Sequence, residues 1–395
     1  MTKVFVTGMG LITSLGDSVV ENRNSLCSGK SGITSLELFK SKYADSLPFA
    51  EIKIATEKLK EILSVDSADL TRTSLLALHA CKQAILDSGL DSSQVKSMRT
   101  AIVGANTVGG MCLTDELYKD SNSKEKGSPF LASYDAGSVT LFLQKHFGLK
   151  GIANTINTAC SSSANVIMYG SRLIKNGLAD RVIVGGVDSL AKFTINGFNS
   201  LHILSKEACR PFDKSRQGLN LGEGAGFLIL EKESLVQNRN VYAEVSGYCN
   251  ANDAFHPSSL SEQGDGPFNA MKGALDLAGI STKDIDYINA HGTATENNDQ
   301  VESVALLRLF GTVPPFSSTK SNTGHTLGAA GAVEAIFSIL SLYHSELYPH
   351  LRFTDPIPET KLIPVQEYEK RDMKHVMSNS FGFGGNCTSL VFSKV

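Results

Sequence analysis

Cys160 lies in the stretch NTACSSS (157–163), where small side chains leave room around its sulfur. The surrounding segment predicts a strand to about Asn157 and then a helix that ends near Gly177. We expect the serines to cap free N–H groups at the start of this helix. The helix dipole should then lower the pKa of the thiol and stabilise a thiolate, while neighbouring N–H groups could receive an oxyanion. This placement suits a nucleophile; a buried structural cysteine is the alternative.

His291 is the second residue that could do chemistry. In YINAHGTATENND (287–299), an apolar strand leads into a turn of glycine, threonines and asparagines, and the helix DQVESVALLRLFG follows. A histidine at a strand end beside glycine is well placed to face a cleft. The alternative is a turn histidine that only bonds to backbone.

Lys320 and His325 occupy a polar turn that opens a long apolar helix, in STKSNTGHTLGAAGAVEAIFSILSLY (318–343). A helix N-terminus disfavours added positive charge, so we expect His325 to stay neutral and to act as a hydrogen-bond donor, for example to an enolate oxygen. Glu334 is the one charge on this apolar helix. A buried carboxylate needs a partner, and pairing with Lys320 would supply it.

The segment NSFGFGGNC (379–387) predicts a tight loop near the C-terminus that could bring backbone close to a reaction centre. A β-bulge between the final strands is the alternative. Together, one cysteine, two histidines and a lysine on separate turns predict covalent acyl chemistry. Cys160, His291 and His325 could also ligate zinc, but their spacing matches no familiar zinc pattern. TGMGLIT and GANTVGG are incomplete as dinucleotide and phosphate-binding loops, which argues against a nicotinamide oxidoreductase.

Short apolar strands alternate with amphipathic helices along the chain, which indicates an α/β fold. The helix predicted over 72–89 places Leu75, Leu76, Ala80, Ile85 and Leu86 roughly on one side and ends at a glycine. A coarse similarity between the two parts of the chain suggests a duplication. We expect a first half, 1–240, that carries the nucleophile and a second half, 241–395, that carries the histidines, joined near the polar stretch 231–243.

Composition narrows the class of protein. The chain has 395 residues and a net charge of −3, so no basic surplus points to nucleic acid or to an anionic membrane. No apolar run approaches the roughly 20 residues that cross a bilayer, and the N-terminus lacks the features of a signal peptide. Seven scattered cysteines without a C-x-x-C pair favour free thiols in a reducing compartment. We therefore expect a cytoplasmic protein without nucleic-acid or membrane partners.

The ordered motifs NTACSSS, HGTATENND, KSNTGHTLGAAG and NSFGFGG resemble those of the elongating β-ketoacyl-acyl-carrier-protein synthases, with RPFDKSRQGLNLGEGAGFLILE and VFVTGMGLITSLG in support. The resemblance implies the thiolase fold, two α/β halves in five α-β-α-β-α layers. It also implies acyl- and malonyl-carrier proteins as partners, a homodimer, and no metal or cofactor. Cys160 would be the nucleophile, His291 and His325 would act in malonyl decarboxylation and condensation, and Lys320 would support them with Glu334.

The same resemblance assigns the oxyanion hole to the backbone N–H groups of Cys160 and Phe383, and makes Phe383 the acyl gate. Two rivals keep the fold but change the activity. A non-catalytic subunit would normally have lost the nucleophile. A degradative thiolase would need a second catalytic cysteine, for which Cys387 is the candidate.

The sequence departs from the family pattern in places. HGTATENND replaces the usual proline region with Glu296 and Asn297, and Asn220 stands where an apolar residue is common. The link LSKEACR (204–210) is short, and SVDSADLTRT (64–73) lacks the basic cluster that often contacts carrier protein. These departures keep two pathways open: fatty-acid elongation, or a specialised polyketide such as an aryl polyene or flexirubin-like pigment. In the second, a chain-length-factor subunit would make the dimer a heterodimer.

Overall fold

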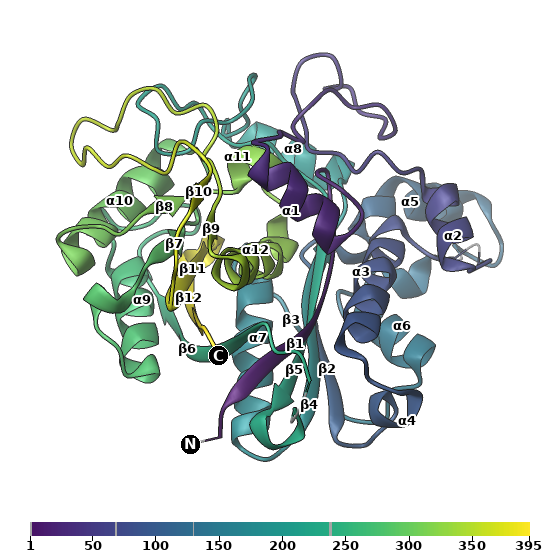
Figure 1. The fold of residues 1–395 in the computed structure, drawn as a ribbon. Coiled ribbons are helices and arrows are strands. Elements are labelled where there is room, and N and C mark those ends of the chain that lie inside the picture. Colours follow the sequence, from purple (N-terminus) through teal and green to yellow (C-terminus); the bar gives the residue numbers. More distant parts are fainter. Residues whose placement is uncertain (1, 68, 129, 237–238) are drawn as a thin grey trace.

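The chain folds into two similar groups of strands and helices, which converge on a pair of central helices (Figure 1). The computed structural model describes residues 2–67, 69–128, 130–236 and 239–395. The strands of the first group are β1 (Val4–Thr13), β2 (Thr100–Ala105), β3 (Ala153–Ile156), β4 (Arg181–Asp188) and β5 (Gly224–Lys232). Those of the second group are β6 (Ala243–Asn252), β7 (Tyr287–Asn289), β8 (Phe316–Ser317), β11 (His375–Phe381) and β12 (Asn386–Ser393). A separate ribbon joins β9 (Glu346–Leu347) to β10 (Glu369–Lys370).

The helices follow the same two groups. Those before the chain midpoint are α1 (Val19–Cys27), α2 (Thr56–Leu63), α3 (Arg72–Ser88), α4 (Ser92–Val95), α5 (Thr114–Ser123), α6 (Ser138–Phe147), α7 (Ser162–Lys175) and α8 (Lys192–Ser200). The later ones are α9 (Asp265–Ala278), α10 (Glu296–Phe310), α11 (Lys320–Thr323) and α12 (Ala330–His344). Short 3-10 turns are η1 (Gly109–Leu113), η2 (Leu131–Ser133), η3 (Glu233–Leu235), η4 (Thr282–Asp284), η5 (Leu327–Ala329) and η6 (Phe383–Gly385).

The two groups of strands have the same topology. The first runs in the order β3-β2-β4-β5-β1, and the second runs in the equivalent order β8-β7-β11-β12-β6. In each group the outer three strands are parallel, and the next two pair antiparallel. Two residue pairs, Phe5 with Glu244 and Val6 with Ala243, join the groups into one hydrogen-bonded sheet. The duplication inferred from the sequence is therefore present in the topology.

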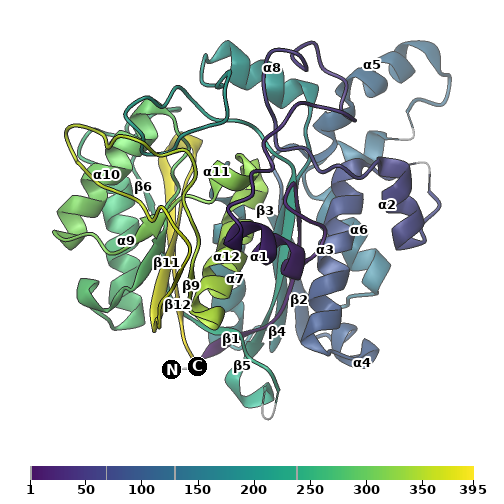
Figure 2. The same cartoon turned by 45° about the horizontal axis from the view of Figure 1, so that its top comes forward.

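Helices and sheets form five layers. Figures 1 and 2 show α3 and α6 outside the first sheet, α7 and α12 between the two sheets, and α9 and α10 outside the second. Strands β1, β2 and β5 are buried along almost their whole length, as expected for strands covered on both faces. The structure confirms the predicted five-layered α-β-α-β-α fold. The exact division at 240/241 stays a prediction, and residues 237–238 of the joining segment lie outside the described residues.

Two helices differ in detail from the sequence prediction. Helix α3 ends at Gly89 as expected, with the left-handed φ of +67° that favours glycine there. Leu86, however, is 70% exposed, because it lies one residue, or about 100° of turn, beyond the buried Ile85. The segment Leu327–His344 is long and apolar enough to cross a membrane by composition alone, although we expected no such segment. It is 89% buried inside the protein, where two sheets cover it, so its all-round hydrophobicity matches a core position.

Candidate active site

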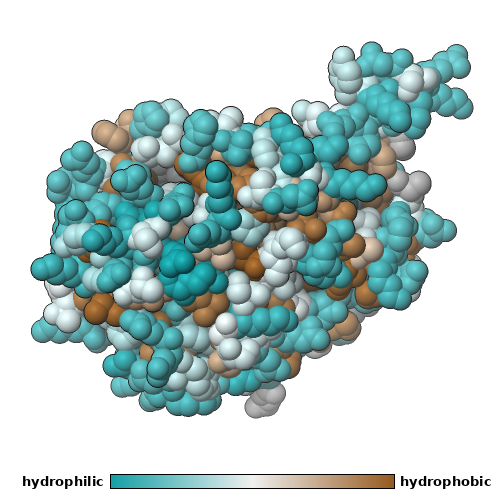
Figure 3. Space-filling model, turned by 90° about the horizontal axis from the view of Figure 1, so that it is seen from above, coloured by the Kyte–Doolittle hydropathy of each residue, from teal (hydrophilic) through white to brown (hydrophobic). Residues whose placement is uncertain are grey.

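A cavity of about 840 Å³ opens between the two halves, and Cys160, His291 and His325 all line it. Other parts of its wall come from α8, from the turn after it, from the start of α10 and from the Phe381–Phe383 segment. Seen from above, the hydrophilic surface is interrupted by patches of apolar side chains (Figure 3). The structure thus brings together side chains that lie more than 160 residues apart in the sequence.

Cys160 follows β3 in a tight turn, directly before α7. The preceding Ala159 has a left-handed φ of +54°, and Cys160 itself is 7% exposed. The expected serine caps are wrong, because the Ser161 side chain makes no capping hydrogen bond to α7. Its Oγ instead lies 2.8 Å from the Thr158 carbonyl oxygen and 2.7 Å from Asn386 Oδ1, and its single proton can be donated to either. Ser163 Oγ accepts from the Ala332 N–H of α12 (2.8 Å). The serines therefore fasten the nucleophile turn to the other half of the molecule.

The expectation that Cys160 has a lowered pKa is also wrong. Burial raises the pKa of the Cys160 thiol to about 11, since a thiolate loses hydration in the interior. The positive charge of Lys320 and the backbone N–H of Phe383 act in the opposite direction and favour the thiolate, but burial outweighs them. The resting thiol is therefore protonated at neutral pH.

Gly382 brings the C-terminal loop against the backbone of Cys160. A Cβ added at Gly382 would lie 2.8 Å from the Thr158 carbonyl oxygen and 3.1 Å from the Cys160 nitrogen, so only glycine fits. The next N–H, that of Phe383, faces the Cys160 sulfur. The loop predicted from NSFGFGG thus approaches the thiol through its main chain, and the Phe383 N–H lies where an oxyanion donor is needed.

His291 and His325 meet edge to face, with ring centroids 5.5 Å apart. Nδ1 of His291 lies 3.2 Å from the Lys320 ammonium, which has only hydrogens to offer, and Nδ1 of His325 accepts from the Leu327 N–H at 3.1 Å. Since Nδ1 is an acceptor in both rings, each neutral imidazole carries its proton on Nε2. Both rings can therefore donate an Nε2–H.

Both imidazoles are neutral at physiological pH. Burial lowers the pKa of His291 and of His325 well below the ordinary value, and the charge of Lys320 lowers each pKa further. The expected neutrality of His325 is thus present, and its causes are burial and the neighbouring Lys320 charge.

Lys320 connects His291 to the core. Its Nζ donates to the His291 carbonyl at 2.7 Å and forms an ion pair with Glu334 Oε1, as the sequence predicts. Both side chains are almost fully buried. Burial raises the pKa of Glu334 to about 7, even though the Lys320 charge opposes that rise. The pair keeps a positive charge beside His291 without access to water.

Two buried carboxyl groups of the site were not anticipated. Glu302 on α10 accepts the N–H groups of His291 and Gly292, each at 2.8 Å, and so fixes the strand end that carries His291. Asp188 at the end of β4 accepts the N–H groups of Gly328 (2.7 Å) and Val108 (2.9 Å). Burial raises the pKa of Glu302 to about 7 and that of Asp188 to about 6. The sequence signal that could have revealed them is an acid among buried apolar positions: Glu302 follows Asp299 by one turn of α10, and Asp188 ends an apolar strand.

Phe198 of α8 is a further residue that the sequence did not reveal. Its ring stacks on that of Phe383, with centroids 5.8 Å apart and planes 15° from parallel. Both rings line the cavity beside Cys160. This aromatic pair lies where an acyl gate is expected.

The alternatives for the cysteines and histidines find little support. No cluster of three or more His, Cys, Asp or Glu side chains in the described part of the chain is arranged to hold a metal ion. Cys387 is buried within β12, its sulfur contacts the Gly385 carbonyl at 3.5 Å, and it does not line the cavity. The second cysteine that a thiolase would use is therefore away from Cys160's cavity.

Known proteins resemble the chain over its whole length. The family described as "Beta-ketoacyl synthase, N-terminal domain" matches residues 1–235, and its C-terminal domain matches residues 242–354. The 3-oxoacyl-[acyl-carrier-protein] synthase 2 of Staphylococcus aureus is 34% identical, with 99% of this chain and 98% of that protein covered. Among solved structures, the ishigamide ketosynthase/chain length factor superposes with a TM-score of 0.92 at 29% identity, covering 100% and 99% of the two chains. The ketosynthase ApeO, in complex with its chain length factor ApeC from Xenorhabdus doucetiae, gives 0.86 at 32%, covering 100% and 98%.

Fold, cavity and relatives together define an acyltransferase of the condensing-enzyme class with a thiolase-like fold. Within that class, the chain belongs to the β-ketoacyl synthase family. The motif resemblance noted in the sequence is thereby confirmed, and the thiolase alternative is set aside.

Proposed function

We propose that Cys160 accepts an acyl group from a carrier protein in the first half of the reaction. The sulfur attacks the thioester carbonyl of the acyl carrier, and the N–H groups of Cys160 and Phe383 hold the resulting oxyanion. The bond between the acyl carbon and the carrier's sulfur then breaks, and the carrier leaves as a thiol with the proton that Cys160 gave up. The observation that carries the proposal is the meeting of Cys160 with two neutral imidazole donors in one cavity.

In the second half, the carbon–carbon bond forms. Malonyl carrier protein loses carbon dioxide, and the electron pair of the broken bond moves into the thioester as an enolate. The Nε2–H groups of His291 and His325 donate to the enolate oxygen, which neutral imidazoles can do without a proton transfer. The enolate carbon attacks the acyl group on Cys160, the carbon–sulfur bond breaks, and the returning thiolate takes a proton. Lys320 and Glu334 hold His291 in place.

We assign the reaction to fatty-acid chain elongation, because the Staphylococcus aureus relative, 34% identical over nearly the full chain, is a 3-oxoacyl-[acyl-carrier-protein] synthase 2. A specialised polyketide pathway, such as one for an aryl polyene or flexirubin-like pigment, is the second candidate. Two solved structures that resemble the chain are ketosynthases with chain length factors, and Glu296 and Asn297, which replace the family's proline region, line the cavity.

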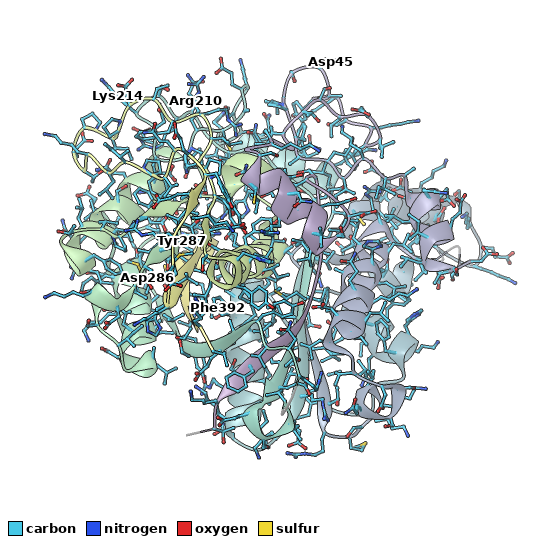
Figure 4. All side chains as sticks on the ribbon, viewed as in Figure 1. Asp45, Arg210, Lys214, Asp286, Tyr287 and Phe392 are labelled. Carbon is cyan, nitrogen blue, oxygen red and sulfur yellow. The ribbon has the colours of Figure 1, made fainter. Side chains whose placement is uncertain are left out.

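The carrier protein would dock beside the cavity mouth. In the segment 64–73, of which residue 68 lies outside the described residues, the single basic residue is Arg72, and it pairs inward with Glu223 at 2.7 Å. Exposed cations follow the cavity-lining Ile203 instead, at Lys206 and Lys214, with Arg210 partly exposed between them. Arg210 and Lys214 project from the upper end of the molecule (Figure 4). These side chains would attract an acidic carrier.

A second subunit would cover the edge of the sheet at β3. This strand has one neighbour, β2, and its residues are partly exposed. Leu131, Tyr134 and Leu141, from segments around α6, are each more than half exposed. A copy of the same chain gives a homodimer, and a chain-length-factor-like subunit gives a heterodimer. We place the enzyme in the cytoplasm, where its seven free cysteines stay reduced.

Intact mass spectrometry tests the proposal. Wild type and Cys160→Ala are incubated with carrier proteins bearing saturated or polyenoic acyl groups, and malonyl carrier protein is then added. We expect a mass gain on wild type alone and a malonyl-dependent β-ketoacyl product. A preference for saturated chains supports fatty-acid elongation, whereas a preference for polyenoic chains supports the pigment pathway. A folded wild type that accepts no acyl group from any donor would contradict the enzyme assignment.

A further inference from the structure

Asn220 is a buried polar residue that lies directly beside the turn carrying His325. It is 1% exposed, and its side-chain amide is fully used. Oδ1 accepts the N–H of Cys209 at 2.7 Å, and Nδ2 lies 3.2 Å from each of the carbonyl oxygens of Pro48, Ser205 and Glu207. A valine or leucine of similar size could make none of these bonds, so the amide has a specific structural task.

That task is to shape the short link between Leu204 and Arg210. Three of the four groups bound by the amide, in Ser205, Glu207 and Cys209, belong to this link. The backbone of the link also pairs with that of Leu219, through the Ser205 N–H to the Leu219 carbonyl and the Leu219 N–H to the Ile203 carbonyl, each at 2.9 Å. The side chain of Asn220 therefore lies inside the turn formed by this link and holds the link's backbone in place.

The backbone of Asn220 holds His325 on its other side. The His325 N–H donates to the Asn220 carbonyl at 2.7 Å, and the Gly222 N–H donates to the His325 carbonyl at 2.9 Å. Gly324, with a left-handed φ of +64°, approaches so closely that a Cβ there would lie 2.9 Å from the Asn220 carbonyl oxygen. The main chain of His325 thus rests directly on that of Asn220.

Cys209, which belongs to the link, makes a second contact with the turn that carries Lys320 and His325. The Cys209 sulfur lies 3.5 Å from the Lys320 carbonyl oxygen, and the Cys209 carbonyl accepts from Arg352 Nε at 2.8 Å. Arg352 also donates to the carbonyl of Ser321, the residue after Lys320. The amide of Asn220 consequently supports both ends of the segment from Lys320 to His325.

We propose that Asn220 is a positioning residue for His325, the residue whose backbone N–H its own carbonyl accepts. Its amide fixes the position of the 204–210 link relative to the 219–222 backbone. This relative position determines where the His325 Nε2–H points in the cavity. The inference rests on the proposed role of His325 as a donor to the enolate. Displacing such a donor by a fraction of an ångström weakens that step, while acyl transfer to Cys160 proceeds without it.

Asn220→Val tests the proposal when the two half-reactions are measured separately. Acyl transfer is followed as the mass gain of Cys160, and malonyl decarboxylation as carbon dioxide release from malonyl carrier protein. We expect decarboxylation to fall about tenfold, with acyl transfer within about twofold of wild type. Asn220→Asp keeps the acceptor for Cys209 and, as a buried neutral acid, offers one O–H to the three carbonyl groups, so its decarboxylation rate should lie between those of Asn220→Val and wild type. It also carries the test if the valine variant does not fold.

Asn22→Val is the matched control. Asn22 is fully buried, donates to the carbonyls of Gly16 (2.9 Å) and Ser18 (2.8 Å), and touches no residue of the site. It should lower the melting temperature without changing the ratio of the two half-reactions. Equal losses in both half-reactions of the Asn220 variants, or unchanged decarboxylation, would overturn the proposal. A wild type inactive in both half-reactions would instead count against the proposed function itself.

Discussion

The two halves of the molecule use the same strand–turn–helix unit to deliver different chemistry. In the first half, the turn between β3 and α7 is short and presents one thiol together with its own N–H. In the second half, the turn between β8 and α12 is longer, includes α11 and η5, and presents both Lys320 and His325. The duplicated topology therefore sets where reactive groups meet, and the length of each turn sets how many of them it can supply.

The halves also differ in how burial acts on their reactive groups. In the first half burial raises the pKa of an acid, the Cys160 thiol, and in the second it lowers the pKa of two bases, His291 and His325. Both shifts leave the group uncharged. The side chains of Cys160, His291 and His325 are therefore neutral before the reaction, and the malonyl carboxylate supplies the charge that is used in condensation.

The largest effect on condensation is expected when Cys160, the nucleophile in the first half of the molecule, is removed. Cys160→Ala should reduce condensation by at least about 10³-fold, because Cys160 supplies the one thiol among the described residues that line the cavity. Product formation from acyl and malonyl carriers measures the effect, with circular dichroism as a check of folding. Condensation at the wild-type rate would show that the thiol is not the acyl carrier.

Loss of His291 or His325, the hydrogen-bond donors in the second half of the molecule, should affect malonyl decarboxylation only. His325→Ala and His291→Ala should each lower malonyl decarboxylation about 10²- to 10³-fold, the usual cost of losing one donor to a developing oxyanion. Acyl loading on Cys160 should remain near the wild-type rate. An equal loss of acyl loading would mean that the two imidazoles also take part in acyl transfer to Cys160.

Lys320→Met probes stability as well as chemistry. It leaves Glu334 buried without its partner, so the free energy of unfolding should fall by about 3–5 kcal/mol. The pKa of His291 should rise, since the Lys320 charge lowers it. Denaturant unfolding and histidine NMR titration measure the two effects, and Lys320→Met with Glu334→Gln is the control that removes the orphan charge. An unchanged titration of His291 would contradict the electrostatic role.

The pH dependence of alkylation sharpens the contrast between the halves. With a pKa of about 11, the thiolate fraction of Cys160 should rise about tenfold per pH unit between pH 7 and 10. Iodoacetamide labelling of Cys160, read by peptide mass spectrometry, should follow this rise. A rate that levels off near pH 7 would show that the helix dipole, rather than burial, dominates.

The smallest expected effect concerns the gate. Phe198→Ala removes the ring stacked on Phe383, and an aromatic pair of this kind contributes about 0.5–1.5 kcal/mol. We expect the relative rates for short and long acyl carriers to change by less than about tenfold, with decarboxylation preserved. Phe193→Ala, also on α8 but 57% exposed, is the control. Identical chain-length profiles for Phe198→Ala and wild type would argue against a gating role.

Local patterns predicted much of the fold and the position of the site. Strand and helix periodicity identified the α/β alternation, and serine- or glycine-containing turns located Cys160, His291, Lys320 and His325. The pairing of Glu334 with Lys320 was also predictable, whereas the partners of Glu302 and Asp188 were not, because these two carboxyl groups bind backbone N–H groups that come near only after folding. The pKa of Cys160 was predicted with the wrong sign for the same reason: the helix start is visible in sequence, whereas the depth of burial is not.

The approach of Gly382 to Cys160 has a consequence for how this cavity can change. The proposed oxyanion donors, the N–H groups of Cys160 and Phe383, are peptide groups, so they persist whatever side chains surround them. The wall formed by residues such as Ser259, Glu262, Glu296, Asn297 and Gln300 consists of side chains that can be exchanged one by one. The residues that determine the chemistry and those that determine acyl selectivity thus lie in separate parts of the chain. Substitutions in the wall can therefore change the acyl substrate while the bond-forming geometry stays the same.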